Sequence, residues 1–475
     1  MPSTLRRSRR RELTLTRSFT NAICDKIHPD HRFLAEIRDH RLLLTGFPNV
    51  RSRSQIDSMC NAGSPPALIS RPPMVFSLHR NPNHIIPSHP IHRLPLELLI
   101  HVFVLGSFDD AMFPVLVSHV CHPWRTIALQ THTLWRRIVL TQHSDLTMWQ
   151  ERLRRARSCT LDVVLASHPS SSMPHDIDVV ALQMHMVAPH LARTRSIDVH
   201  LDEYTPYLWN ITLGPLCSTC YHWGVSPGSR DPNYTSSKLA PRLESLSLRY
   251  PRNDDTKEFT LFDGLSPCLS RLTVEGVRLT WLPGLFGSLK CLDYTHHGFT
   301  SGRAMVDEIL SMLQVSYQLR ELRLCFASKM MEAEILCVGG RPAVEEVVTL
   351  PFLETLSLRV KGTDVKVPTE LVSIISRMSL PMLKKLNLCD SLLAIHSPWN
   401  HDTVQFAGLP TFFDIVYQQA RQSPMTDISV EGRWVDVPLL VGFGRSFPSL
   451  RTIKINGTTR VVWFNDEMLV PTTCV

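Results

Sequence analysis

The chain lacks the signatures of membrane proteins, secreted proteins and the common enzyme families. No apolar run approaches the about eighteen residues that a transmembrane span requires. The 12 cysteines are irregularly spaced and no secretory hydrophobic segment precedes them, which favours a reducing compartment, cytoplasmic and/or nuclear. Glycine-rich phosphate loops, a G-x-S-x-G elbow and an H-E-x-x-H pair are missing too. We therefore expect no catalytic residues, no cofactor and no membrane association.

Metal-binding patterns are present only in part. Cys217 and Cys220, with His222 nearby, have the spacing of half a zinc site, because two thiolates at this separation can share a tetrahedral ion. No second CxxC or histidine pair completes it, so ordinary loop cysteines are the favoured interpretation. Three further histidines lie in a proline-rich stretch, where solvated side chains are expected: His84, His89 and His92. The sequence thus predicts no metal site.

The charge is concentrated at the N-terminus. Residues 1 to 90 hold 14 basic and 6 acidic residues, which leaves 36 basic and 37 acidic residues for the rest of the chain. A neutral body predicts no broad basic face, so we do not expect nucleic acid as its partner. Residues 1 to 85 are rich in Arg, Pro and Ser and are predicted to be disordered. The segment Leu5 to Leu13 has three interpretations: a solvated tail, a nuclear-import patch or a mitochondrial presequence.

A short, very apolar segment follows this N-terminal region. Between Leu96 and Leu105 only Glu97 and His101 are polar, and Pro95 suits the first turn of a helix. Further helices are predicted at 114 to 121 and 123 to 129. About fifty residues in three such helices make a poor independent core. A binding partner would cover the apolar surface that remains.

The segment contains, in chain order, Leu94-Pro95-x-Glu97-Leu98, Val102-Phe103, Val120-Cys121-x-x-Trp124-Arg125, Ala128 and Leu134-Trp135. This pattern resembles an F-box, the helical motif that docks on the Skp-family adaptor of cullin-RING ubiquitin ligases. It implies an F-box-like helical domain at 88–140 that binds a Skp-family adaptor and, through it, a cullin. The implied contact residues are Leu94, Pro95, Glu97, Leu98, Leu99, Val102, Phe103, Val117, Val120, Cys121 and Trp124. Alternatively, these residues form only the core of a small helical subdomain.

Beyond this domain the pattern alternates between helix and strand. A helix is predicted from Leu146, a strand at 159 to 165, a helix at 179 to 191 and a strand at 196 to 201. Residues 202 to 238 contain several prolines and glycines and are predicted to be a loop-like insertion. Later helices are predicted at 304 to 313, 370 to 378 and 412 to 421.

From residue 240 the chain repeats the form x-x-x-L-x-x-L-x-L, as in APRLESLSLRY from Ala240 and LPFLETLSLRV from Leu350. The first apolar position of each repeat recurs at uneven intervals of 20 to 42 residues: Leu243, Leu269, Leu289, Leu319, Leu353, Leu383, Met425 and Leu450. This is a leucine-rich-repeat signal, because each repeat offers one short strand that its neighbours must cover. We predict an irregular leucine-rich-repeat-like solenoid at 145–470 with a parallel strand face. The fold class is therefore α+β or α/β, with a three-helix domain before the solenoid.

A solenoid leaves one strand face exposed, and its polar residues are candidates for substrate binding. We select Arg249, Arg271, Arg323, Lys384, Asn387 and Lys454. The resemblance to F-box proteins with leucine-rich repeats implies a substrate-recognition adaptor of an SCF-type ubiquitin ligase, in the ubiquitin-like conjugation pathway, that holds an unknown protein substrate. The alternatives are a leucine-rich-repeat scaffold with no ligase role and nucleic-acid association through the Arg-rich tail.

Overall fold

The structure is a computed structural model. It describes residue 91 and residues 94–141, 143–166, 176–202, 204–205, 208–217, 239–327, 347–362, 366–390, 405–456 and 458–460. The predictions made for residues 1 to 90, His92, Cys220 and His222 lie outside the described residues. The chain divides between Ala128 and Leu129 into two units. No helix in the described part of the chain is long and apolar enough to span a bilayer.

The first unit contains the three short helices that the apolar pattern predicts. They are α3 (Leu96–Asp109), α4 (Phe113–Ser118) and α5 (His122–Gln130), the last of which ends just beyond the unit boundary. Helix α3 follows Pro95 and carries Glu97 in its first turn, where a carboxylate complements the helix dipole. It runs four residues past its predicted end. Pro123 lies in the first turn of α5, a position that needs no amide hydrogen, so it does not interrupt the helix.

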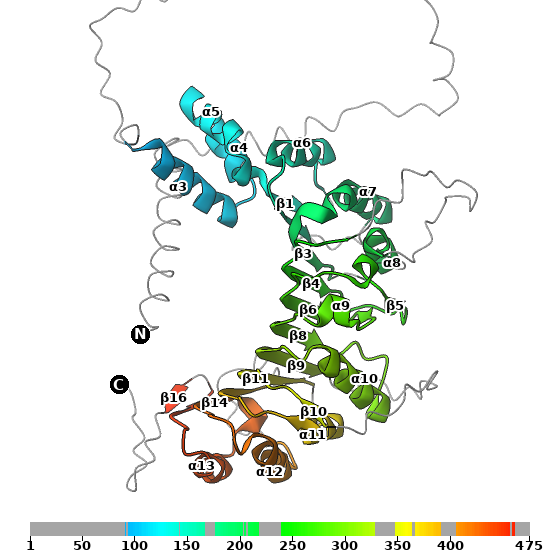
Figure 1. Ribbon diagram of the computed structural model, residues 1–475, viewed down its shortest axis with the longest axis vertical. Helices are drawn as coiled ribbons and strands as arrows, with labels where there is room; N and C mark the ends of the chain where they lie inside the picture. The colour runs from blue at the N-terminus through cyan, green and yellow to red at the C-terminus, as the bar shows by residue number, and fades with distance from the viewer. Residues whose placement is uncertain are drawn as a thin grey trace, which may run out of the picture. The chain divides into compact units, whose positions relative to one another are not determined.

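The second unit is built on one large sheet whose strands follow one another in chain order (Figure 1). Every pairing from β1 to β15 is parallel, and only β16 at the end is antiparallel. The strands of this sheet are β1 (Arg137–Leu140), β2 (Leu161–Ala166), β3 (Thr194–His200), β4 (Ser245–Arg249), β6 (Arg271–Glu275), β8 (Cys291–Thr295), β9 (Glu321–Ala327), β11 (Thr355–Lys361), β13 (Lys385–Asp390), β14 (Asp427–Val430), β15 (Thr452–Ile455) and β16 (Thr458–Arg460).

Helices and turns connect these strands, and the helices lie on one side of the sheet (Figure 1). The α-helices are α6 (Leu146–Ala156), α7 (Ile177–Val187), α8 (Leu208–Leu213), α9 (Pro283–Phe286), α10 (Gly302–Val315), α11 (Thr369–Ser376), α12 (Leu409–Ala420) and α13 (Val437–Arg445). The 3₁₀ helices are η3 (His132–Trp135), η4 (Ala188–Arg193), η5 (Gly214–Leu216), η7 (Phe262–Gly264) and η9 (Gly432–Trp434). Two minor sheets pair β5 (Glu258–Phe259) with β7 (Arg278–Leu279) and β10 (Val348–Thr349) with β12 (Met378–Ser379).

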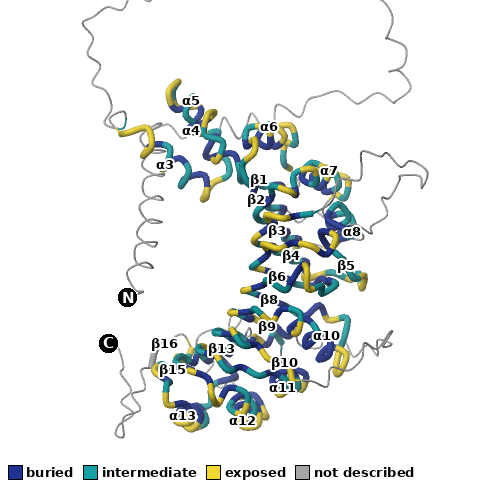
Figure 2. The backbone as a smooth tube through the Cα atoms, in the orientation of Figure 1, coloured by how far each residue is buried: buried dark blue, intermediate teal, exposed yellow. Residues whose placement is uncertain are grey.

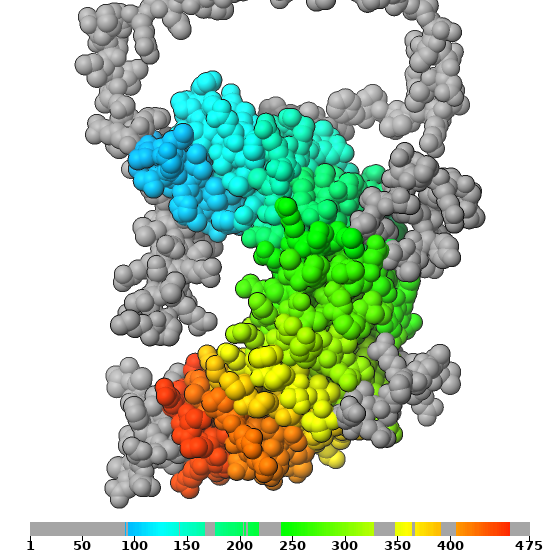
Figure 3. Space-filling view, viewed as in Figure 1, coloured from blue at the N-terminus to red at the C-terminus, as the bar shows by residue number. Residues whose placement is uncertain are grey.

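Alternation along the strands places the core between the sheet and the helices. In β4, Leu246 and Leu248 are buried, whereas Ser245, Ser247 and Arg249 are partly accessible. The same alternation recurs in the later strands, and Figure 2 shows it as dark blue segments that alternate with teal ones. In the space-filling view the colour of this unit changes gradually in chain order (Figure 3), in keeping with the order of the strands in the sheet. Each strand therefore covers part of its predecessor.

The large parallel sheet and the helical N-terminal domain confirm the α/β fold class. The eight repeated segments lead into β4, β6, β8, β9, β11, β13, β14 and β15, and the first apolar position of each is buried. Their assignment as leucine-rich repeats stays a prediction. One prediction was wrong: the loop-like insertion contains α8 and η5, because Trp209 and Leu213, one helical turn apart, bury their side chains in the core. Strand β1 was not predicted.

Candidate functional site

An aromatic cluster holds the three helices of the first unit together. The Phe103 ring from α3 meets the Phe113 ring from α4 edge to face, with 6.3 Å between ring centroids. It also meets the Trp124 ring from α5 at 4.9 Å. All three side chains are buried. Such edge-to-face pairs are favourable because the positive ring edge faces the negative ring face, so each helix contributes one aromatic ring to a shared core.

Close approach between α3 and α4 depends on Gly106. A Cβ atom at this position would lie 2.5 Å from Cε1 of Phe113, closer than two carbon atoms can approach without displacement. The missing side chain thus lets the Phe113 ring reach Phe103. The short turn between these helices is further held by Asp110, whose carboxylate accepts a hydrogen bond of 2.7 Å from the backbone amide of Met112.

The structure separates the predicted adaptor-binding residues into core and surface. The buried members are Leu99, Phe103, Val117 and Trp124, which make the core of the unit itself. The exposed members are Leu94, Pro95, Glu97, Leu98 and Val120, and the partly exposed ones are Val102 and Cys121. Only the surface members can contact a partner directly, because the buried four are covered by their own unit.

One face of α3 remains apolar although it faces solvent. Leu98 is 53% exposed and Phe108 is 43% exposed, and Leu105 between them is partly exposed. Steps of seven and three residues place these three side chains on one stripe of the helix, opposite buried Leu99 and Phe103. On α4, Leu116 is 43% exposed as well. The sequence reasoning missed Phe108 and Leu116, and the almost continuous apolar run of α3 does not show which of its side chains face solvent.

Three short helices around a small aromatic core, with apolar side chains left on the surface, define a small helical domain. Residues 91–141 match the family model described as F-box-like. The chain therefore carries an F-box-like domain, and the resemblance seen at residues 91 to 138 is confirmed. No curated protein matches the chain.

The predicted substrate-binding residues lie along the exposed strand face of the second unit. Arg323, Asn387 and Lys454 share one register row across β9 to β15, connected through Ser357 and Ser429. The remaining members occupy other rows: Arg271 begins β6, Arg249 ends β4, and Lys384 precedes β13. The sheet therefore places three of the six candidates in one row across neighbouring strands. Two others lie on the earlier strands β4 and β6, and Lys384 lies just before β13.

Salt bridges occupy some of these side chains. The Arg323 guanidinium lies 2.6 Å from a Glu321 oxygen and 3.7 Å from an Asp293 oxygen. The Lys384 ammonium lies 3.3 Å from Glu354, and the Asn387 amide donates to the Ser357 hydroxyl at 2.9 Å. Among the described residues no salt bridge holds the third register member, Lys454, which is exposed. A ligand would meet that cation without first displacing a carboxylate.

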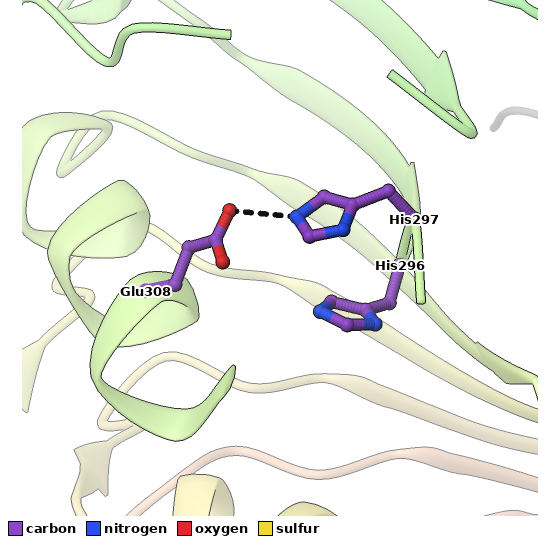
Figure 4. A group of neighbouring side chains, drawn as sticks. All are labelled: His296, His297 and Glu308. Atoms are coloured by element: carbon purple, nitrogen blue, oxygen red, sulfur yellow. Dashed lines mark hydrogen bonds and ion pairs between the residues drawn. The ribbon is translucent and has the colours of Figure 1, made fainter. Parts of the chain in front are cut away.

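A histidine pair after β8 forms a second candidate site, which the sequence reasoning did not single out. His296, His297 and Glu308 of α10 place their ligand atoms within 4.8 Å of one another (Figure 4). Nε2 of His297 donates to a Glu308 oxygen at 2.8 Å. Nε2 of His296 lies 3.0 Å from the Thr300 hydroxyl, which donates to the other Glu308 oxygen at 2.9 Å. Hydrogen bonds thus connect the four side chains in one chain, from His296 through Thr300 and Glu308 to His297.

Backbone contacts decide which ring nitrogens of these histidines carry hydrogen. The amides of Gly298 and Phe299 donate to Nδ1 of His296 and of His297 at 3.1 and 3.0 Å. Each Nδ1 is therefore an acceptor, and we assign the hydrogen to each Nε2. A metal bound at Nε2 needs the hydrogen on Nδ1, where it would face a second donor. The network thus fits neutral histidines around a carboxylate better than a metal centre.

Burial sets the protonation of this network. Desolvation, followed by the neighbouring His297, lowers the pKa of His296 to about 3, so its ring is neutral at ordinary pH. Burial alone would raise the pKa of Glu308, but the hydrogen bond and the electrostatic attraction of His297, followed by the hydrogen bond of Thr300, outweigh it and lower that pKa to about 2. The site holds a buried carboxylate anion beside the neutral ring of His296.

This assignment predicts that metal ions do not stabilise the protein. Because metal coordination would break two backbone hydrogen bonds, we expect the same thermal midpoint after dialysis against EDTA and after addition of zinc chloride. Differential scanning fluorimetry of the wild type and of His297→Gln measures this. A midpoint that rises with zinc in the wild type but not in His297→Gln would contradict the assignment.

Proposed function

We propose that the chain is a substrate-recognition adaptor of an SCF-type cullin-RING ubiquitin ligase. In this proposal the F-box-like domain at residues 91–141 docks on a Skp-family protein and, through it, on a cullin. The second unit acts as an irregular leucine-rich-repeat solenoid whose strand face holds a protein substrate. The chain itself is non-enzymatic and acts in the cytoplasm and/or the nucleus.

The apolar stripe on α3 is the observation that carries this proposal. Leu98 and Phe108 stay near half exposed, although α3 has neighbours on its opposite face. Burying a leucine or phenylalanine side chain contributes roughly 1.5–3 kcal/mol, so a partner that covers this stripe gains substantial free energy. Surface leucines and phenylalanines that cluster on a matched docking domain favour a protein-binding role over a purely internal one.

The contribution to catalysis would be proximity. A tethered substrate reaches an effective concentration in the millimolar range near a ubiquitin-loaded enzyme. Correct positioning then accelerates transfer to a substrate lysine without any bond chemistry in this chain. The proposed function therefore requires one binding surface on each unit and no catalytic nucleophile in this chain.

The docking claim is tested by co-purification with a Skp-family adaptor. We expect Leu98→Asp/Phe108→Asp to reduce recovery by about tenfold or more, because a carboxylate would be buried at each anchor. Leu94→Ala/Pro95→Ala should reduce it as well. The matched control is Leu182→Asp on α7, whose leucine is 58% exposed outside the F-box-like domain. Equal recovery from all four proteins would remove the ligase role and favour a scaffold.

A further inference from the structure

One rim of the sheet combines exposed apolar side chains with unpaired cations. Tyr317, Phe352 and Met382 are 49%, 51% and 44% exposed. They lie in the turns that directly precede β9, β11 and β13, three adjacent strands. Because neighbouring strands are about 5 Å apart, the three side chains form a short apolar row. We call this row the apolar rim.

The three turns share one construction, so the row is regular. In each turn the backbone amide of a buried leucine donates to the carbonyl oxygen three residues earlier: Leu319 to Ser316, Leu353 to Leu350 and Leu383 to Leu380. The leucine points into the core, and Phe352 and Met382, the residues directly before it in two of the turns, point toward solvent. Tyr317 stands two residues before Leu319 instead of one. A row of this size resembles the apolar anchors that interfaces bury at their centre.

The strand face beside the rim has a positive excess that the rest of the face lacks. Eight basic and five acidic residues occupy 320–327, 354–361, 384–390, 426–431 and 451–455, which cover β9 to β15 and their flanks. The corresponding positions of the first six strands are nearly balanced, with six basic and five acidic residues at 136–139, 160–166, 195–200, 244–249, 270–275 and 290–295. Residues 91 to 475 are nearly neutral in total, but the positive excess of the strand face lies mainly at β9 to β15.

In the part of the chain that the structure describes, several of these cations either share one carboxylate or form no salt bridge. Glu354 lies 3.3 Å from Lys384 and 3.8 Å from Arg320, so one negative charge serves two positive ones. Lys385, Arg451 and Lys454 are exposed and belong to no salt bridge within the described residues. Unpaired surface cations attract anions across the about 8 Å screening length of physiological salt.

We propose that this surface binds an acidic protein segment that carries apolar anchors. The proposal rests on the proposed function, because it names the chemical class of substrate that the strand face would hold. Phe352 and Met382 would cover the apolar side chains of the segment, while Lys385 and Lys454 meet its carboxylates. A peptide can carry carboxylates only at the positions that face Lys385 and Lys454. A nucleic acid carries a phosphate at every nucleotide, so some of its phosphates would lie near Glu354 and Asp427 and be repelled. The charge pattern thus favours a peptide.

Selection of random dodecapeptides displayed on phage against the immobilised full-length chain tests this inference. We expect enriched peptides with net negative charge and at least one aromatic or aliphatic residue. An enriched peptide, labelled with fluorescein, should bind Lys385→Glu/Lys454→Glu and Phe352→Ser/Met382→Ser about tenfold more weakly than the wild type. Arg421→Glu/Arg445→Glu, which makes the same change of charge at exposed residues after α12 and in α13, should bind as the wild type does.

Three results would overturn the inference: no enrichment or enrichment of basic peptides, equal weakening by Arg421→Glu/Arg445→Glu, or tighter binding of single-stranded RNA than of peptide. Adaptor recovery in the same preparations separates this outcome from the proposed function. Peptide binding without adaptor recovery removes the ligase role and keeps the acidic-segment site. Adaptor recovery without selective peptide binding removes only the site.

Discussion

Replacing Phe103 with alanine should unfold the F-box-like helices. The Phe103 ring is fully buried and is the one ring that contacts both Phe113 and Trp124. Removing a buried phenylalanine costs about 3–5 kcal/mol, through lost burial and the cavity left behind. Three short helices have few other buried side chains to compensate, so the loss approaches their whole stability. Adaptor binding should disappear with the fold.

Hydrogen exchange measured by mass spectrometry checks this prediction. Peptides from residues 94 to 128 should exchange rapidly in Phe103→Ala, while peptides from the second unit keep their protection. Leu98→Ala is the matched control, because it removes an exposed side chain of the same helix and should weaken adaptor binding with protection unchanged. If Phe103→Ala kept full protection, the aromatic cluster would not be the core of this unit.

Phe103 and Leu98 also show what the sequence could not predict about the docking site, namely which side chains of α3 face the core and which face solvent. Helix α3 is apolar on nearly all sides, so its periodicity could not tell that Leu99 faces the core and Leu98 the solvent. Those orientations follow from the position of α4, which depends on the contact of Gly106 with Phe113. The existence of the helices was predictable because Pro95, Glu97 and the apolar runs are local signals.

The strand face shows the same division between local and long-range information. Alternation predicted that Leu246 and Leu248 point inward and Arg249 outward, because side chains along a strand alternate between its faces. Strand β1 was missed because Trp135 takes the first apolar position there, whereas the repeats were recognised by leucine or methionine at that position. The register between neighbouring strands decides which cations form salt bridges. Asp293 on β8, for example, forms a salt bridge with Arg323 on β9.

Acidification from pH 7 to pH 4.5 should destabilise the second unit, and His296 should account for much of the loss. The pKa of His296 is lowered from 6.5 to about 3 by burial and by His297. Between these two pH values His296 is therefore protonated in the unfolded chain but neutral in the folded chain. This contribution to stability is complete above pH 6.5 and is lost as the pH falls toward 3. At pH 4.5 the loss is on the order of 3 kcal/mol.

Two other groups act in the same direction. Burial, followed by Arg193, lowers the pKa of His190, so this residue adds to the loss in the same pH range. The pKa of Glu308 is lowered from 4.5 to about 2, so its contribution is present above pH 4.5 and disappears only below that value. A first loss below pH 6.5 and a second below pH 4.5 are therefore expected, and only the second depends on the carboxylate.

Urea unfolding followed by tryptophan fluorescence at pH 7 and pH 4.5 measures the effect. His296→Gln keeps a donor near Thr300 but has no titrating group, so it should be less stable at pH 7 and lose much less on acidification. His143→Gln, which replaces an exposed histidine of the same unit, should retain the full pH dependence. Equal slopes for the wild type and His296→Gln would show that folding does not lower the pKa of His296, which would contradict a neutral buried ring at pH 4.5.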